Sequence, residues 1–277
     1  MNSNPAKQTI LVTGGAGYIG SIMVEQLLET GYQVVVLDNL SEGHRQAVPS
    51  SIPFYQGNIG DKILLDKLFS EQNIFAVMHF AALALVGESV KYPEVYEENN
   101  VTQTLTLLDA MQAHKVKRFV FSSSCAIFGE PKKLPIKEDD TKAPINPYGA
   151  NKLKVEESLK QRAANNGLQF CALRYFNAAG ATKLNGEDRK IETHIIPIVL
   201  NVALGKRPSL DIYGTDYPTP DGSCVRDYIH VLDLTNAHLL ALTYLEKTPA
   251  SFFNLGNEQG SSVKEVVEVA RLVTGKQ

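Results

Sequence analysis

The 277-residue chain has no tryptophan and only three cysteines, Cys125, Cys171 and Cys224. A small, odd and widely spaced set of cysteines excludes a disulfide framework, and no Cys-x-x-Cys pair indicates a zinc site. No other metal site is expected. The 27 basic and 30 acidic residues leave a net charge of -3, so no basic excess indicates a nucleic acid or an anionic membrane as partner.

Long apolar runs are also missing. The longest run, residues 76–86, is too short to cross a bilayer, so no membrane partner is expected. The N-terminus lacks the basic-then-apolar pattern of a signal peptide. With so few cysteines, the expected compartment is the reducing cytoplasm.

What the chain does contain is an alternation of apolar runs and helical stretches, with 44% hydrophobic residues overall. Several runs are continuously apolar, which is typical of strands buried on both faces of a parallel sheet. Strands are predicted at Thr9–Thr13, Gln33–Asp38, Pro53–Gln56, Ala76–Ala81, Arg118–Ser122 and Phe170–Tyr175. Helices are predicted at Tyr18–Thr30, Lys62–Glu71, Val95–Ala113 and Tyr148–Asn165. The repetition predicts an α/β fold with a Rossmann-like, doubly wound parallel sheet.

The pattern changes after about Asn177. Residues 178–190 and 208–222 are predicted loops, and helices are predicted at Glu192–Leu204, Leu232–Lys247 and Ser262–Val273, with a short strand at Phe252–Leu255. We expect a dinucleotide-binding domain at residues 1–178 and a smaller, partial substrate-binding domain at residues 179–277.

A glycine-rich turn joins the first predicted strand to the first helix. Gly14, Gly17 and Gly20 have the spacing that permits a tight turn, close approach of a pyrophosphate and close helix packing, respectively. The second strand ends in Asp38, where an acid accepts hydrogen bonds from the adenosine ribose and repels a 2′-phosphate. The pattern favours NAD over NADP, and the alternative for Asp38 is a turn or capping role.

A candidate catalytic group follows the strand that ends in the serine run at residues 122–124. Tyr148 and Lys152 are four residues apart on one helix face, which begins after Pro147. A free tyrosine is too weakly acidic to act as a base at neutral pH. A nearby ammonium, with the positive charge of an oxidised nicotinamide, would stabilise the phenolate. The arrangement predicts proton transfer from a substrate hydroxyl, coupled to hydride transfer to NAD.

Several motifs together resemble the extended short-chain dehydrogenase/reductase family, and within it the enzymes that epimerise UDP-hexoses at C4. The matching stretches are residues 13–21, Leu37–Leu40, His79–Ala82, Val86–Ser89, Asn99–Val101, Leu173–Asn177 and Val225–Val231. The resemblance implies oxidation at C4 by NAD, turnover of a 4-keto sugar, and return of the hydride to the other face.

The resemblance also implies roles for individual residues. It makes Ser124, Tyr148 and Lys152 the catalytic triad. Cofactor contacts are implied for Gly14, Gly17, Tyr18, Ile19, Gly20, Asp38, Asn39, Asn58, Ile59, Phe80, Ala81, Asn99, Tyr148, Lys152 and Tyr175. Contacts with the UDP-sugar substrate are implied for Ser124, Tyr148, Phe176, Asn177, His194, Tyr213 and Arg226. A homodimer is implied through the helices predicted at 95–113 and 148–165.

The chain departs from that family at a few positions. Asn58 stands where relatives have an aspartate that reads adenine, and an amide still accepts that hydrogen bond. Ala126 removes a hydroxyl near the sugar, which leaves the preferred UDP-sugar open. Relatives continue past Gln277 with residues that hold UDP and select the sugar. The expected substrate domain is therefore C-terminally truncated.

Two alternative functions stay open. One is another nucleotide-sugar reaction, such as UDP-pentose or UDP-N-acetylhexosamine 4-epimerisation, or dehydration, which Cys125 and Ala126 disfavour because dehydratases carry acids there. Another is a weakly active nucleotide-sugar binder. For single residues, structural roles are favoured at His79, His230 and Cys125.

Overall fold

The computed structural model describes residues 8–276. The first seven residues and Gln277 lie outside the described residues. They include most of the segment for which the sequence predicts no signal peptide, and the last residue of the end that is expected to be truncated.

Seven parallel strands form the larger sheet, in the order β3-β2-β1-β4-β5-β6-β9. They are β1 (Thr9–Thr13), β2 (Gln33–Asp38), β3 (Phe54–Gln56), β4 (Ile74–His79), β5 (Arg118–Ser124), β6 (Gln169–Tyr175) and β9 (Ala250–Leu255). The direction of winding reverses between β1 and β4, the point where open α/β sheets bind ligands. The predicted Rossmann-like doubly wound sheet is confirmed.

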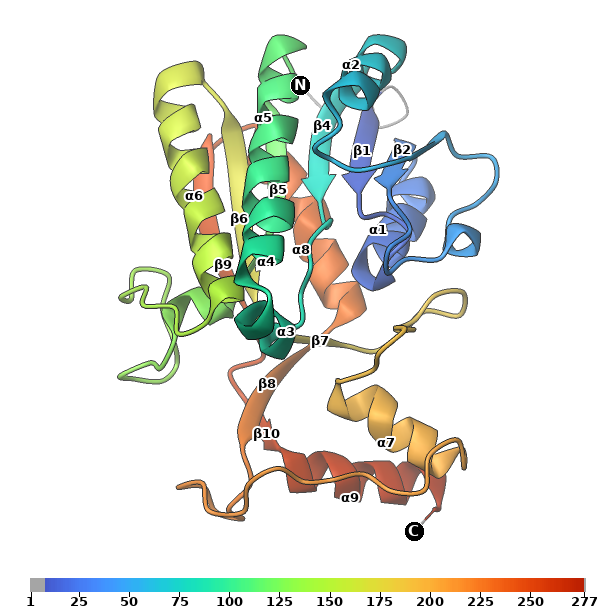
Figure 1. Ribbon diagram of the computed structural model, residues 1–277, viewed down its shortest axis with the longest axis vertical. Helices are drawn as coiled ribbons and strands as arrows, with labels where there is room; N and C mark the ends of the chain where they lie inside the picture. The colour runs from blue at the N-terminus through green and yellow to red at the C-terminus, as the bar shows by residue number, and fades with distance from the viewer. Residues whose placement is uncertain (1–7, 277) are drawn as a thin grey trace.

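Helices cover both faces of this sheet (Figure 1). α1 (Tyr18–Glu29) and α8 (Val231–Tyr244) pack on one face, and α2 (Lys62–Glu71), α5 (Gln103–Ala113) and α6 (Pro147–Asn166) pack on the other. Apolar side chains alternate between the two faces of each strand, so that Leu11 joins one core and Ile10 the other. Both faces of the sheet are therefore buried, as the continuous apolar runs predict.

The helix predicted at 95–113 is interrupted. It consists of α4 (Pro93–Glu97), a π-helical turn at Glu98–Thr102 and α5, and it follows a short helix α3 (Val86–Lys91) that the sequence analysis did not predict. Within the π-turn, the Asn100 side chain donates to the Leu83 carbonyl oxygen at 2.9 Å and accepts from the Leu83 backbone N–H at 2.8 Å. The π-helical turn thereby fixes the position of the segment that follows β4.

A smaller three-stranded sheet lies beyond the carboxyl ends of the large sheet (Figure 1). Its order is β10-β8-β7, from β7 (Asn177–Ala179), β8 (Val225–His230) and β10 (Gly260–Ser262), and α7 (Ile195–Ala203) and α9 (Val263–Thr274) accompany it. The sequence patterns do not predict these three strands. Two have only three residues, and β8 mixes charged with apolar residues, three of them exposed, so none shows the apolar pattern on which strand prediction depends.

Two segments after residue 178 return to the large sheet. α8 packs against α1, β5 and β6, and β9 pairs with β6 along its whole length. The division at residue 178 stays a prediction about domains. Short 3₁₀ helices at Arg45–Ala47 and Cys125–Phe128 complete the described elements. Between residues 8 and 276, no helix is both long and apolar enough to cross a membrane.

Candidate active site

The glycine-rich turn is built by close backbone contacts. Gly14 has φ +72°, and its N–H donates to the Leu37 carbonyl oxygen at 2.9 Å. A Cβ on Gly14 would lie 2.6 Å from the Ala81 nitrogen, and one on Gly20 would overlap the Gly14 carbonyl oxygen. The turn from β1 into α1 therefore requires glycine at both positions, because any side chain would push the strand and helix apart.

The N-terminus of α1 is available to an anion. Its N-cap, Gly17, provides no side-chain hydrogen bond, and no acidic residue lies in the first turn. The first N–H groups of a helix, here those of Tyr18, Ile19 and Gly20, have no partner inside the helix and lie at its positive end. A Cβ on Gly17 would meet only the Gly14 carbonyl oxygen, at 3.4 Å. The outer side of the turn is thus open for a phosphate group.

Asp38 ends β2 beside this turn and is buried. Its Oδ2 accepts from the Ala16 N–H at 2.9 Å, and its Oδ1 accepts from the Leu40 N–H at 2.8 Å. The carboxylate therefore braces the turn, which is the structural role considered for it. Each carboxylate oxygen still has acceptor capacity for a ribose hydroxyl, so the two roles are compatible.

The other cofactor candidates lie around the same edge. Asn39 donates to the Asn58 side-chain oxygen at 2.8 Å. The Phe80 ring lies 4.7 Å from the His238 ring. Ile59 is different, because it is buried in the core at 5% exposure. Asn99 donates to the Asn100 side chain at 2.9 Å, next to the clamp on Leu83.

Ser124, Tyr148 and Lys152 meet at the end of β5. The Ser124 hydroxyl lies close enough to the Tyr148 hydroxyl to act on its pKa, and the Ser124 Oγ accepts from the Ala126 N–H at 3.2 Å. The Lys152 Nζ lies 5.8 Å from the centre of the Tyr148 ring and donates to the Ser122 carbonyl oxygen at 2.8 Å. Asn146 caps α6 by accepting from the Gly149 N–H, which fixes where the helix starts.

Burial dominates the electrostatics of this group. It raises the pKa of Tyr148, while the Ser124 hydrogen bond and the positive charge of Arg189 act in the opposite direction. It lowers the pKa of Lys152 to about 7, against the attraction of the Glu156 carboxylate. The protein alone therefore does not make Tyr148 a base at neutral pH. A further positive charge beside the phenol is needed.

Ser122 connects the end of β5 to α8. Its Oγ lies 3.0 Å from the His238 Nε2, and its hydroxyl also acts to lower the pKa of the buried Tyr175. The His238 Nδ1 donates to the Leu234 carbonyl oxygen at 2.8 Å, so Nε2 is the acceptor for the serine hydroxyl. Burial lowers the pKa of His238 to about 4, and the ring is neutral. Ser122 thus links the Lys152 and Tyr175 side chains to α8.

The substrate candidates divide into two groups. Asn177 and Arg226 come from the paired strands β7 and β8, and the Asn177 side chain donates to the Asp227 carbonyl oxygen at 2.8 Å. Phe176 precedes β7 and packs on Cys125, Ile127 and Phe128. His194 occupies the N-cap position of α7 without a capping side-chain hydrogen bond, and its Nδ1 lies 2.6 Å from the Glu187 carboxylate; Tyr213 is 82% exposed. Within residues 8–276, no hydrogen bond or ring contact connects Tyr213 to the triad.

Several residues near the triad escaped the sequence analysis. Arg189, in the predicted loop, acts on both Tyr148 and Tyr175, and it pairs with Glu187 at 2.7 Å. A loop arginine carries no periodic signal, so only the fold places it there. Glu187, Glu192 and His194 have ligand atoms within 4.8 Å of one another, but Glu187 is already bonded to Arg189 and His194.

The structural roles favoured for two histidines and a cysteine are confirmed. Both ring nitrogens of His79 are bonded inside the core, Nδ1 to Thr13 at 2.7 Å and Nε2 to Thr104 at 3.0 Å. His230 caps α8 by accepting from the Leu232 N–H. Cys125 is buried, its thiol donates to the Arg174 carbonyl oxygen, and burial raises its pKa. It is therefore no ready nucleophile.

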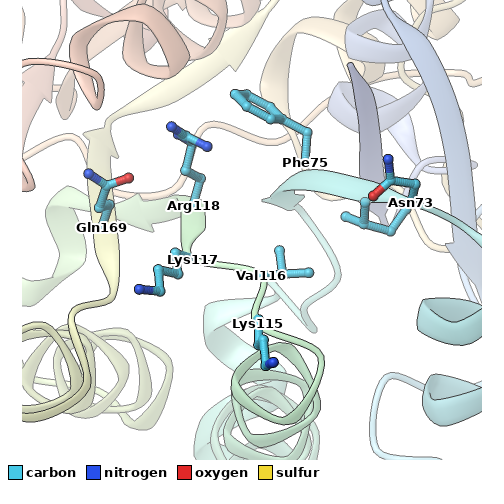
Figure 2. A pocket seen from close by; sticks show the side chains of 8 residues that line it. Asn73, Phe75, Lys115, Val116, Lys117, Arg118 and Gln169 are labelled. Atoms are coloured by element: carbon cyan, nitrogen blue, oxygen red, sulfur yellow. The ribbon is translucent and has the colours of Figure 1, made fainter. Parts of the chain in front are cut away.

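A basic cavity lies at the opposite edge of the sheet, where β4, β5 and β6 begin. Figure 2 shows its lining, with the Arg118 guanidinium beside the Phe75 ring, 4.2 Å from the ring centroid. Lys115, Lys117 and Gln169 complete the basic and polar side of the lining. The cavity is separated from Ser124 and Tyr148 by the length of β5, so it takes no part in their chemistry.

Comparisons with known proteins show the family to which the chain is similar. The NAD dependent epimerase/dehydratase family matches residues 10–256. A UDP-glucose 4-epimerase of Halalkalibacterium halodurans is 57% identical over 269 residues, 96% of this chain and 80% of that protein. A solved UDP-glucose 4-epimerase structure is 47% identical, with a TM-score of 0.95 over 98% of this chain and 83% of the other.

A further solved structure was determined with ligands. It is the UDP-glucose 4-epimerase of Bifidobacterium longum in complex with NAD+ and UDP, 40% identical, with a TM-score of 0.92. The alignment covers 97% of this chain and 84% of that one.

Proposed function

The chain belongs to the NAD dependent epimerase/dehydratase family, and we propose that it is a UDP-glucose 4-epimerase. The proposed reaction inverts C4 of UDP-glucose or UDP-galactose through a 4-keto sugar. The observation that carries the proposal is the meeting of Ser124, Tyr148 and Lys152 at the carboxyl end of β5, on the sheet edge that holds the glycine turn. That edge is where an α/β sheet binds a dinucleotide.

NAD fits the residues at this edge. The open side of Gly17 and the uncapped N-terminus of α1 suit its pyrophosphate, and Asp38 suits the adenosine ribose. We assign the adenine side to Asn39 and Asn58, and the nicotinamide side to Phe80, Tyr148 and Lys152. When bound, NAD supplies a hydride acceptor, a hydride donor for the return step, and a positive charge near Tyr148.

In the proposed mechanism, Tyr148 exchanges one proton with the C4 oxygen of the sugar. Ser124, whose hydroxyl acts on the pKa of Tyr148, orients that oxygen. The Lys152 ammonium stabilises the phenolate, because the two groups are close and buried from water. The same tyrosine returns the proton after the sugar has presented its other face, so the protein ends each cycle unchanged.

The diphosphate of the substrate is assigned to Asn177 and Arg226, from β7 and β8. Arg226 is exposed, and its guanidinium is free to form bidentate bonds beyond the one it donates to its neighbouring carbonyl oxygen. Of the two residues that precede Asn177, we assign Phe176 to the sugar side and Tyr175 to the nicotinamide side. His194 and Tyr213 stay proposed contacts of the uridine side.

A second candidate is another reaction on a UDP-sugar. It is favoured by Ala126, which follows Ser124 and Cys125 in a 3₁₀ turn and offers no hydroxyl to the sugar. Incubating the purified protein with UDP-galactose, UDP-N-acetylgalactosamine and UDP-xylose, with NMR of the products, separates the candidates. We expect UDP-glucose from UDP-galactose as the fastest conversion. Absence of any C4 inversion would contradict the proposal.

We further propose a homodimer that forms through residues 95–113, which include α5, and through α6, a cytoplasmic location, and a division into a cofactor part at residues 1–178 and a substrate part at 179–277. Exposed Val90 on α3, Tyr92 before α4 and Val95 on α4, elements that pack beside α6, support the dimer. The three cysteines are unpaired, which suits a reducing compartment.

A further inference from the structure

A buried carboxylate lies on the catalytic face of α6. Tyr148, Lys152 and Glu156 follow one another at four-residue intervals, so they share one side of the helix, which faces the sheet. Their exposed fractions are 8%, 4% and 0%. Glu156 has no route to solvent or substrate, yet it lies one helical turn from the catalytic lysine.

Glu156 is held by three hydrogen bonds. Arg174 on β6 donates two hydrogen bonds to the carboxylate, from Nε to Oε1 at 2.9 Å and from Nη2 to Oε2 at 2.7 Å. The Ser123 hydroxyl donates to Oε1 at 2.7 Å. A two-pronged arginine contact of this kind fixes both the position and the orientation of a carboxylate. The negative charge therefore stays where the fold places it.

The end of β5 anchors three consecutive turns of α6 in parallel. Ser122 accepts from Lys152 through its carbonyl oxygen, Ser123 donates to Glu156, and the Ser124 hydroxyl lies close enough to Tyr148 to act on its pKa. A displacement of Glu156 would therefore also displace Lys152 and Tyr148, which lie on the same face of α6. The strand and helix form one rigid unit at the site of chemistry.

We propose that Glu156, held by Arg174 and Ser123, is a positioning residue that keeps the Lys152 ammonium charged and aimed beside Tyr148. The proposal rests on the proposed function of the triad. Glu156 touches neither substrate nor cofactor, and it acts through Lys152.

The negative charge of Glu156 affects the protonation of Lys152 because the lysine is buried. Burial lowers the pKa of Lys152 to about 7, and Glu156 acts against that change. Tyr148, Tyr175 and His79 beside it are neutral, since burial raises the pKa of both tyrosines and lowers the pKa of His79 to about 3. The charged and titratable groups that face this region are Tyr148 and Glu156 on α6, His79 on β4, Cys125 after β5, Arg174 and Tyr175 on β6, His238 on α8, Glu97 on α4 (bonded to Asn151 and Lys154), and Arg189 in the loop.

The test is the titration of Lys152 in the nucleotide-loaded protein as purified. Carbon-13 labelling of lysine followed by NMR gives its pKa directly, with the signal assigned by its loss in Lys152→Met. We expect Glu156→Gln to lower the pKa of Lys152 by about one to three pH units, because a nearby opposite charge has been removed. Glu157→Gln makes the same chemical change at the next, exposed position and should leave the titration unchanged.

Turnover of UDP-galactose provides the second readout. The alkaline limb of the pH profile should move to lower pH in Glu156→Gln, and Glu156→Asp, which keeps the charge, should restore most of the difference. A purely structural role would lower turnover evenly across pH and leave the titration of Lys152 in place. Folded Glu156→Gln with an unchanged Lys152 titration overturns the proposal.

If Glu156→Gln does not fold, the double variant Glu156→Gln/Arg174→Met removes both charges of the pair. Replacing a whole buried pair is tolerated far better than leaving one charge alone. Its Lys152 titration should move in the same direction, and an unchanged titration again overturns the proposal. Because NMR does not depend on turnover, a protein that fails to convert any UDP-sugar would refute the proposed function and still decide the role of Glu156.

Discussion

The Lys152 ammonium donates to the Ser122 carbonyl oxygen at 2.8 Å, and this bond ties the catalytic helix to the end of strand β5. Lys152 Nζ also lies 4.8 Å from the Phe121 ring and 5.8 Å from the Tyr148 ring. A carbonyl oxygen and two aromatic faces all favour a cation. The lysine is thus held in a place where its charge, once present, acts on the Tyr148 hydroxyl.

Removing the Tyr148 hydroxyl should abolish most of the activity. We expect Tyr148→Phe to lower kcat by at least about a hundredfold, the contribution of one acid/base group. NAD content and thermal stability should stay near those of the unchanged protein, because only one buried hydroxyl is lost. The measurement is UDP-galactose turnover, with Tyr244→Phe on α8 as the matched control. Near-normal turnover in Tyr148→Phe would refute the assigned base.

Two glycines of the turn should differ in what they control. Gly20→Ala should destabilise the fold, because its Cβ would overlap the Gly14 carbonyl oxygen, whereas Gly17→Ala meets that oxygen only at 3.4 Å. Gly17→Ala should therefore stay folded and lose NAD affinity, since the methyl group occupies the side assigned to the pyrophosphate. Thermal melting and NAD titration distinguish the two outcomes. Gly87→Ala, which would contact nothing within 4 Å, is the control.

An unchanged NAD affinity in folded Gly17→Ala would contradict the assigned phosphate position. A fully stable Gly20→Ala would contradict the close packing of α1 on the turn.

Stability should fall as the pH drops below about 6. Burial lowers the pKa of His79 to about 3 and that of His238 to about 4, from an ordinary value of 6.5. Between these values the unfolded chain binds protons that the folded chain does not, so the free energy of unfolding decreases as the pH falls. Each histidine contributes up to about 1.4 kcal/mol per pH unit.

Urea unfolding between pH 7 and pH 4, in the unchanged protein and in His79→Asn, checks this expectation. The variant should be less stable at neutral pH and should show a smaller slope with pH. His114→Asn is the control, because that ring is partly exposed beside Asp66. An equal slope in His79→Asn and the unchanged protein would contradict a neutral, buried His79.

The proposed dimer can be tested by introducing a charged residue on the exposed apolar surface. Val95 on α4 is 56% exposed, and Leu240 on α8, on the other side of the sheet, is 63% exposed. We expect two chains per particle by size-exclusion chromatography with light scattering, and one chain in Val95→Asp. Leu240→Asp should not change the mass. If the unchanged protein is a monomer at micromolar concentration, the proposed dimer is wrong.

Much of the architecture follows from local sequence. The strands β1 and β2 and the helix α2 were predicted with their observed bounds, because buried parallel strands and amphipathic helices have strong periods. The small sheet of β7, β8 and β10 could not be predicted, since two of its strands have three residues, none has a continuous apolar run, and all three pair across distant segments. The π-turn before α5 likewise depends on the clamp between Asn100 and Leu83.

The sequence alone determined the glycine turn, Asp38, and the spacing of Tyr148 and Lys152, because each of these signals lies within one element or at its end. Only the tertiary structure decided what surrounds them. Arg189, Glu156 and Arg174 come from different parts of the chain, and their effect on the triad depends on burial and on distances across the fold. Charge acts through space, and no pattern along a single segment records which distant charge a fold will bring near.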